Sequence, residues 1–246
     1  MENSVSVSST AAPSRRTRRF SRLSVYTRLV LILSAVLTFG GAALLAVLEW
    51  NNPWTLGGMP VWQKLLASLF QSVTTRTAGF FTVSQAGLTE AGKAVSDMLM
   101  FVGGSSGSTA GGLKTVTLGV VVLAAVGTAR GRSRASVFRH TIPQEKVSQA
   151  MTLFMLMLTL AFVGAALICA CSGCSLSTAL YETVSALATV GLTAGLTATL
   201  TTLPKLLLIV FMFFGRVGIM TISIGFLTAS RAEDRFEYAP ARMLIG

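Results

Sequence analysis

The amino-acid sequence predicts an all-α integral membrane protein with two tandem units, each a membrane helix, a re-entrant loop and a second membrane helix. Three observations lead to this fold class. Hydrophobic residues make up 52% of the 246 residues and charged residues only 12%, with a mean hydropathy of +0.68, whereas soluble domains carry about 25% charged residues. Two uncharged runs, at 29–48 and 151–170, are twenty residues long, enough to cross the ~30 Å hydrocarbon core of a bilayer. The same order of segments also occurs twice.

The charges are distributed as in a membrane protein. Twenty basic and nine acidic residues give a formal net charge of +11. The basic residues cluster at 15–28, 130–139 and 231–242, each beside a long apolar run. This is the pattern of cytoplasmic ends, so we expect both termini and the central linker in the cytoplasm. The clustering disfavours the alternative of nucleic-acid binding.

The first unit is expected at 23–128, after a disordered cytoplasmic N-terminus at 1–22. An uncharged run at 29–48 predicts a membrane helix. Residues 61–70 predict a helix about half as long as a span, followed by the polar sequence QSVTTRTAGFFT. Non-helical backbone is tolerated at membrane depth only where protein or water satisfies it. The pattern therefore predicts a re-entrant segment.

The apolar stretch at 94–127 is interrupted by GGSSGSTAGGLK at 103–114. Its five glycines and three serines disfavour a continuous helix. We expect a helix, a loop inside the membrane and another helix. A basic cytoplasmic linker at 129–146 follows.

The second unit is expected at 147–229, before a cytoplasmic C-terminus at 230–246. It repeats the plan with a span at 151–170, a short helix at 177–188, the polar turn ATVGLTAG, and a span at 206–227 broken by GRVG. One offset aligns the landmarks, because Gly79 and Gly191 are 112 residues apart, and so are Gly103 and Gly215. The offset indicates a duplicated unit.

The polar turns TAGF (77–80) and TVGL (189–192) have the composition of an ion filter. Selective filters replace the hydration shell of an ion with backbone carbonyls, and glycine permits the backbone conformations that this needs. A tight turn between packed helices is the alternative interpretation.

Four longer motifs resemble the Trk/Ktr/HKT family of potassium and sodium transporters: SVTTRTAGF (72–80), MFVGGSSGSTAGGLKT (100–115), YETVSALATVGLT (181–193) and FFGRVGIMTI (213–222). The resemblance implies four helix–pore–helix repeats around one pseudo-fourfold pore. This chain would supply the third and fourth repeats, half of such a cation channel.

The resemblance also implies roles for particular residues. The filter residues that it implies are Thr77, Ala78, Gly79, Phe80, Thr189, Val190, Gly191 and Leu192. The gate residues that it implies are Gly103, Gly104, Ser105, Gly107, Ser108, Thr109, Gly111, Gly112, Lys114 and Arg216.

Several charged residues near these motifs keep open alternatives. Arg216 lies mid-span, where a charge costs at least ~2.5 kcal/mol and usually faces a cavity. Lys114 faces a cavity or reaches the interface. Arg76 either tunes the field at the filter or holds the pore helix. Glu182 is expected to open the second pore helix, where its charge suits the helix N-terminus.

Enzyme and nucleotide chemistry find no support in the sequence. The single histidine, His140, lies in the basic linker, and the carboxylates show no paired or metal-ligand spacing. GSTAGGLKT approaches a phosphate-binding loop, but Leu113 stands where the lysine is needed. We expect no cofactor, and K⁺ or Na⁺ as the transported ion.

Two loops cannot encircle an ion, so we expect a partner or a missing part. The second half-pore would be an identical copy or a separately encoded chain. The alternative is a truncated, non-conducting membrane fragment or scaffold. The resemblance also implies a cytosolic nucleotide-binding regulatory subunit, which the basic segments at 130–139 and 231–242 would dock. The alternative is that these charges only orient the spans and contact anionic lipid. The expected location is the plasma membrane.

Overall fold

The structure is a computed structural model that describes residues 24–105, 110–131, 136–138 and 140–217. The expected N-terminal and C-terminal cytoplasmic segments, at 1–22 and 230–246, therefore lie outside the described residues. The described elements are helices α1 (Val25–Glu49), α2 (Val61–Thr74), α3 (Glu90–Phe101), α4 (Thr115–Ala129), α5 (Gln144–Ser172), α6 (Leu176–Leu187), α7 (Leu196–Thr199) and α8 (Thr202–Val217), and strands β1 (Ser136–Val137) and β2 (His140–Thr141). The prediction of a helical fold is confirmed.

Two of the described helices are long and apolar enough to cross a membrane. They are α1, with 25 residues, and α5, with 29, which at ~1.5 Å per residue exceed the ~30 Å hydrocarbon core. Both run past the predicted spans. The Ser24 side chain caps α1 by accepting a hydrogen bond from the Thr27 amide, and α5 ends at Gly173 in the left-handed conformation.

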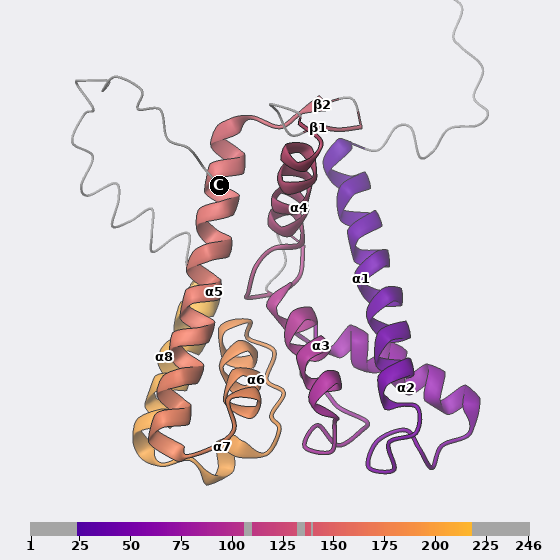
Figure 1. The fold of residues 1–246 in the computed structure, drawn as a ribbon, viewed down its shortest axis with the longest axis vertical. Helices are drawn as coiled ribbons and strands as arrows, with labels where there is room; N and C mark the ends of the chain where they lie inside the picture. The colour runs from indigo at the N-terminus through magenta and orange to yellow at the C-terminus, as the bar shows by residue number, and fades with distance from the viewer. Residues whose placement is uncertain (1–23, 106–109, 132–135, 139, 218–246) are drawn as a thin grey trace, which may run out of the picture.

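The two long helices, α1 and α5, begin at the same end of the molecule, where the hairpin also lies (Figure 1). Figure 1 shows the start of α1, the β1–β2 hairpin and the start of α5 at the top, and α2, α6 and α7 in the lower half. In the hairpin, Ser136 lies opposite Thr141. Helix α5 begins at Gln144, inside the predicted linker.

Helix α2 continues four residues beyond the predicted 61–70, through the polar sequence that we expected to be non-helical. The reason is that polar side chains find partners on neighbouring elements. Ser72 Oγ donates to the α1 carbonyl of Thr38 at 2.8 Å. Polar composition therefore does not end a helix that packs against exposed carbonyls.

The predicted interruption between α3 and α4 is present in the described residues, where α3 ends at Phe101 and α4 starts at Thr115. The two ends of the connecting segment lie side by side. The Gly103 amide donates to the Leu113 carbonyl at 2.9 Å, and the Leu113 amide donates to the Phe101 carbonyl at 3.2 Å. The chain thus leaves α3 and returns beside it.

The predicted break of the last span at 215–218 is wrong in its described part. Helix α8 continues through Gly215 and Arg216 to Val217. Gly215 serves close packing instead, since an added Cβ would lie 2.1 Å from the Leu187 carbonyl oxygen. Although Gly103 and Gly215 are related by the offset, they have different structures. Gly218 lies outside the described residues.

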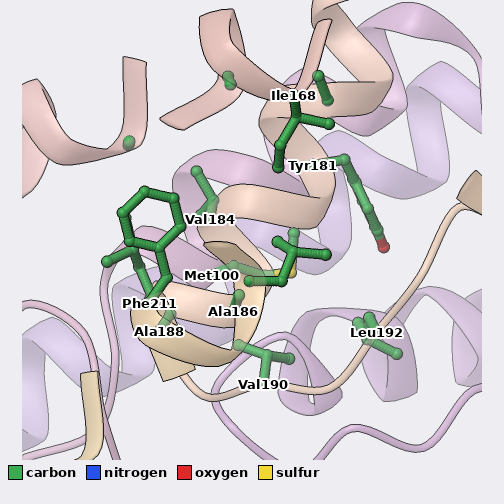
Figure 2. Packing of buried hydrophobic residues seen from close by; sticks show 14 of the residues in the cluster. Met100, Ile168, Tyr181, Val184, Ala186, Ala188, Val190, Leu192 and Phe211 are labelled. Atoms are coloured by element: carbon green, nitrogen blue, oxygen red, sulfur yellow. The ribbon is translucent and has the colours of Figure 1, made fainter. Parts of the chain in front are cut away.

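The main hydrophobic core surrounds α6. This helix contacts α3, α5 and α8, and its buried residues pack with Met100 of α3, Ile168 of α5 and Phe211 of α8 (Figure 2). The core reaches Val190 and Leu192 in the turn that follows α6. The core therefore fixes that turn.

Candidate functional site

The two glycine turns lie against each other. We define the first turn as residues 75–80, after α2, and the second turn as residues 188–192, after α6. A Cβ added at Gly79 would lie 2.3 Å from the carbonyl oxygen of Val190. The fold thus brings two segments from different halves of the chain into backbone contact.

The two turns share an unusual backbone conformation. Thr77 and Gly79 have φ of 72° and 78°, and Thr189 and Gly191 have φ of 55° and 89°. The residue between each pair does not have a positive φ. A left-handed conformation costs a non-glycine residue roughly 1–2 kcal/mol, and a β-branched residue seldom adopts it. Strain of this kind tends to mark functional sites.

The two turns also match in the hydrogen bonding of their carbonyls. Within the described part of the structure, six carbonyl oxygens of the turns accept no hydrogen bond. They belong to Thr77, Ala78, Gly79, Thr189, Val190 and Gly191. They are the groups that could meet a cation.

The other two predicted filter residues differ. The carbonyl of Phe80 accepts a hydrogen bond from Thr74 Oγ1, and that of Leu192 accepts one from Ser185 Oγ at 2.6 Å. Each donor lies near the end of the short helix before the turn. These two carbonyls are tied back toward their own helices.

Arg76 anchors the first turn. Its guanidinium donates to the Ser34 carbonyl at 3.3 Å, to Thr38 Oγ1 at 3.2 Å and to Thr115 Oγ1 at 3.4 Å. Ser34 and Thr38 belong to α1, and Thr115 begins α4. These contacts favour the interpretation that Arg76 holds the end of α2 in place.

The segment between α3 and α4 supports the second turn. The amide of Gly111 donates to Thr189 Oγ1 at 3.0 Å. An added Cβ at Gly111 would lie 2.5 Å from the same oxygen, and one at Gly112 would lie 3.2 Å from the Cβ of Ala188. Glycine at these positions permits the close approach.

The remaining predicted gate residues are placed as follows. Gly103 lies within this close contact, since an added Cβ would be 2.1 Å from the Gly111 carbonyl oxygen. Lys114 precedes α4 and donates to the Ala110 carbonyl, and Arg216 lies in the last turn of α8. Gly104 and Ser105 continue from Gly103, whereas Gly107, Ser108 and Thr109 lie outside the described residues.

We expected Glu182 to lie at the start of the second short helix. This prediction is wrong, because α6 begins six residues earlier. It is buried and organises the chain after the second turn. Its carboxylate accepts hydrogen bonds from Thr193 Oγ1 at 2.6 Å, the Ala194 amide at 3.0 Å and Thr197 Oγ1 at 2.6 Å. In the sequence, the threonines after the TVGL motif were the signal that could have indicated hydrogen-bond donors to this carboxylate.

A buried polar group joins the two halves and was not predicted. The Tyr181 hydroxyl donates to Gln85 Oε1 at 2.8 Å, and Gln71 Nε2 donates to the same oxygen at 2.6 Å. Tyr181 lies on α6 and Gln71 on α2. Both short helices are thereby linked behind the turns, through a contact that sequence spacing cannot reveal.

Comparison with known proteins agrees with a transporter fold. The model of a family described as "TrkH: Cation transport protein" matches residues 17–237. The chain belongs to this family of membrane ion transporters, which are not enzymes. The predicted resemblance is therefore confirmed.

Particular relatives show how much of the family architecture the chain covers. It is 36% identical over 233 residues to the potassium/sodium uptake protein NtpJ of Enterococcus hirae, covering 93% of this chain and 51% of that protein. It is 34% identical over 221 residues to the Ktr system potassium uptake protein B of Bacillus subtilis, covering 90% and 50%. The chain spans about half the length of these curated relatives.

A solved structure has the same fold. The potassium transporter TrkH of Vibrio parahaemolyticus matches with a TM-score of 0.62 and 23% identity, over 80% of this chain and 43% of that one.

Proposed function

We propose that this chain is a membrane subunit of a monovalent cation uptake channel or transporter, with K⁺ as its ion. Cations would pass the two turns and meet backbone carbonyls in place of water. The observation that carries this proposal is the pair of matched, strained turns, which contact each other at Gly79 and Val190. A merely connecting turn has no need for strain at the same two positions in both halves.

The carbonyls of Thr77, Ala78 and Gly79 and of Thr189, Val190 and Gly191 are the proposed ion ligands. Phe80 and Leu192 would instead fix the ends of the filter, because their carbonyls already accept hydrogen bonds. This assignment refines the role that the family resemblance implies.

The proposed gate is formed by the segment after α3, with Lys114 and Arg216. Gly111 and Gly112 of this segment pack directly against the second turn, and two cationic side chains beside a cation pathway would raise the electrostatic barrier. Lys114 and Arg216 come from different halves of the chain.

A complete pore requires a further unit of the same kind. This proposal is supported by an exposed surface on α2 and the first turn, whose counterpart on α6 and the second turn is buried. At the 112-residue offset, Val73 is 49% exposed and Ser185 3%, while Phe80 is 72% exposed and Leu192 2%. Helix α3 covers α6, so an α3-like helix of a second unit would cover α2. An identical copy or a separately encoded chain would supply it.

The choice of K⁺ is supported by the relatives, whose names state potassium or potassium/sodium uptake. Na⁺ is the alternative ion, and no cofactor is proposed. A cytosolic regulatory subunit or anionic lipid would meet the basic segments at 130–139 and 231–242, which lie mostly outside the described residues. We propose a plasma-membrane location with cytoplasmic termini, because of the arginine clusters.

Growth of a potassium-uptake-deficient cell at low K⁺ tests the proposal. Expression of the chain is expected to restore growth, and Gly79→Asp or Gly191→Asp is expected to abolish it. Gly58→Asp is the matched control, because Gly58 is exposed and an added Cβ there would meet no atom within 4 Å.

Absence of growth despite normal membrane expression, alone and with a co-expressed second half, would contradict conduction. That outcome would favour the alternative, a non-conducting membrane fragment or scaffold.

A further inference from the structure

We propose that the segment between α3 and α4 is a common support for both glycine turns, and that Thr115 and Thr189 are its positioning residues. The inference rests on the proposed function and deepens it. It concerns only the described ends of the segment, at 102–104 and 110–115. Cation selectivity would then depend on two hydroxyls that need not touch the ion.

The first support runs through Thr115. Its fully buried hydroxyl donates to the Gly103 carbonyl at 3.0 Å and accepts from the Arg76 guanidinium at 3.4 Å. Arg76 directly precedes Thr77, the first strained residue of the first turn. The Thr115 amide also donates to the Gly104 carbonyl at 3.2 Å. One threonine thus joins the start of the segment to the first turn.

The second support runs through Thr189. Its hydroxyl accepts the Gly111 amide at 3.0 Å, and the same residue holds φ at 55°. The side chain that receives the segment is therefore attached to a strained residue of the second turn. A shift of Gly111 must either break this hydrogen bond or move the turn.

The two supports are themselves connected. The parallel bridge between Val102 and Leu113 and the hydrogen bond from Gly103 to Leu113 hold the two ends of the segment together. The turns also contact each other directly at Gly79 and Val190. The turns and the segment therefore form one closed ring of contacts, in which a change at either threonine reaches both turns.

Isosteric substitutions isolate the hydroxyls. Thr115→Val and Thr189→Val keep the β-branched shape, and with it the backbone preference, but remove the hydrogen bonds. Thr115→Ser and Thr189→Ser restore a hydroxyl. The matched controls are Thr128→Val on α4 and Thr183→Val on α6, since each of these hydroxyls donates only to a carbonyl of its own helix.

The experiment combines hydrogen–deuterium exchange of the purified full chain in membranes with initial rates of K⁺ and Na⁺ uptake. We expect Thr189→Val to speed exchange at residues 110–113 by about tenfold, and Thr115→Val to do so at residues 76–80. We also expect both variants to lower the K⁺ to Na⁺ uptake ratio several-fold, with recovery in the serine variants and no change in the controls.

If hydrogen–deuterium exchange in the valine variants equals that in the controls, the proposal that this segment supports the turns is overturned. Faster exchange with an unchanged uptake ratio would overturn its role in selectivity. If the parent chain moves no cation, alone and with a co-expressed second half, the proposed function fails, and the exchange comparison still decides whether this segment holds the turns.

Discussion

Among single residues, Gly79 and Gly191 have equivalent backbones but unequal surroundings. Both are left-handed, with φ of 78° and 89°. A Cβ at Gly79 would collide with the second turn, whereas one at Gly191 would meet no atom within 4 Å. The two positions therefore allow backbone strain to be separated from crowding.

Alanine at the two positions is expected to have different effects. Gly191→Ala should cost about 1–2 kcal/mol, from the left-handed conformation alone. Gly79→Ala should cost more, because overpacking against backbone adds roughly 1–3 kcal/mol. The midpoint of thermal unfolding in detergent, measured for both variants in parallel, checks the order. A lower midpoint for Gly191→Ala would contradict the contact between the turns.

The sequence predicts that Gly79 and Gly191 lie in special backbone conformations, but it does not predict which atoms surround them. The TAGF and TVGL motifs indicate left-handed positions because few residues other than glycine adopt them. The contact of Gly79 with Val190, and the bond of Thr189 to Gly111, depend on how distant segments pack. No spacing within one chain encodes those contacts.

At the scale of elements, a buried carboxylate joins α1 to α3. Glu49, in the last turn of α1, accepts hydrogen bonds from the Thr89 amide at 2.9 Å, Thr89 Oγ1 at 2.6 Å and Thr55 Oγ1 at 2.8 Å. Thr89 is the N-cap of α3. The negative charge therefore lies at a helix N-terminus, where it is stabilising.

Replacing this carboxylate is expected to weaken the packing of α1 on α3. Glu49→Gln exchanges one acceptor oxygen for an amide donor that faces other donors, at a cost of about 1.5–3 kcal/mol. Glu90→Gln is the control, since Glu90 is exposed in the first turn of α3 and should cost under about 1 kcal/mol. Thermal unfolding of the two variants distinguishes these values, and equal losses would refute the anchoring role.

A helix boundary can be predicted where a local residue, such as glycine, ends the helix. It cannot be predicted where contacts with distant segments determine it. The end of α5 carries its own signal, a glycine after an apolar run. The extension of α2 through Gln71 to Thr74 depends on α1 carbonyls, which lie about 35 residues earlier in the chain. At Gly215, within α8, the glycine serves a close contact with the Leu187 carbonyl, which the sequence around it does not reveal.

For the whole molecule, the asymmetry between α2 and α6 defines a testable surface. In a background with Cys169, Cys171 and Cys174 replaced by serine, Val73→Cys on α2 is expected to form intermolecular crosslinks in membranes. The reason is that a second unit would cover this position. Val47→Cys, on the exposed surface of α1, is the control and should crosslink weakly.

Gel mobility after treatment with a short bifunctional thiol reagent gives the readout. Equal, low crosslinking at both positions, with and without a co-expressed second half, would count against the surface on α2. Preferential crosslinking at position 73 would support the proposed assembly.

The contact between Gly79 and Val190 has a mechanical consequence. Two loops that touch backbone to backbone cannot be widened one at a time, because any outward displacement of one changes the spacing of both. The two turns are therefore expected to move together as one unit. In the proposed filter, an ion of the wrong size would therefore have to deform both halves of the chain together, and the resistance to such an ion would be collective.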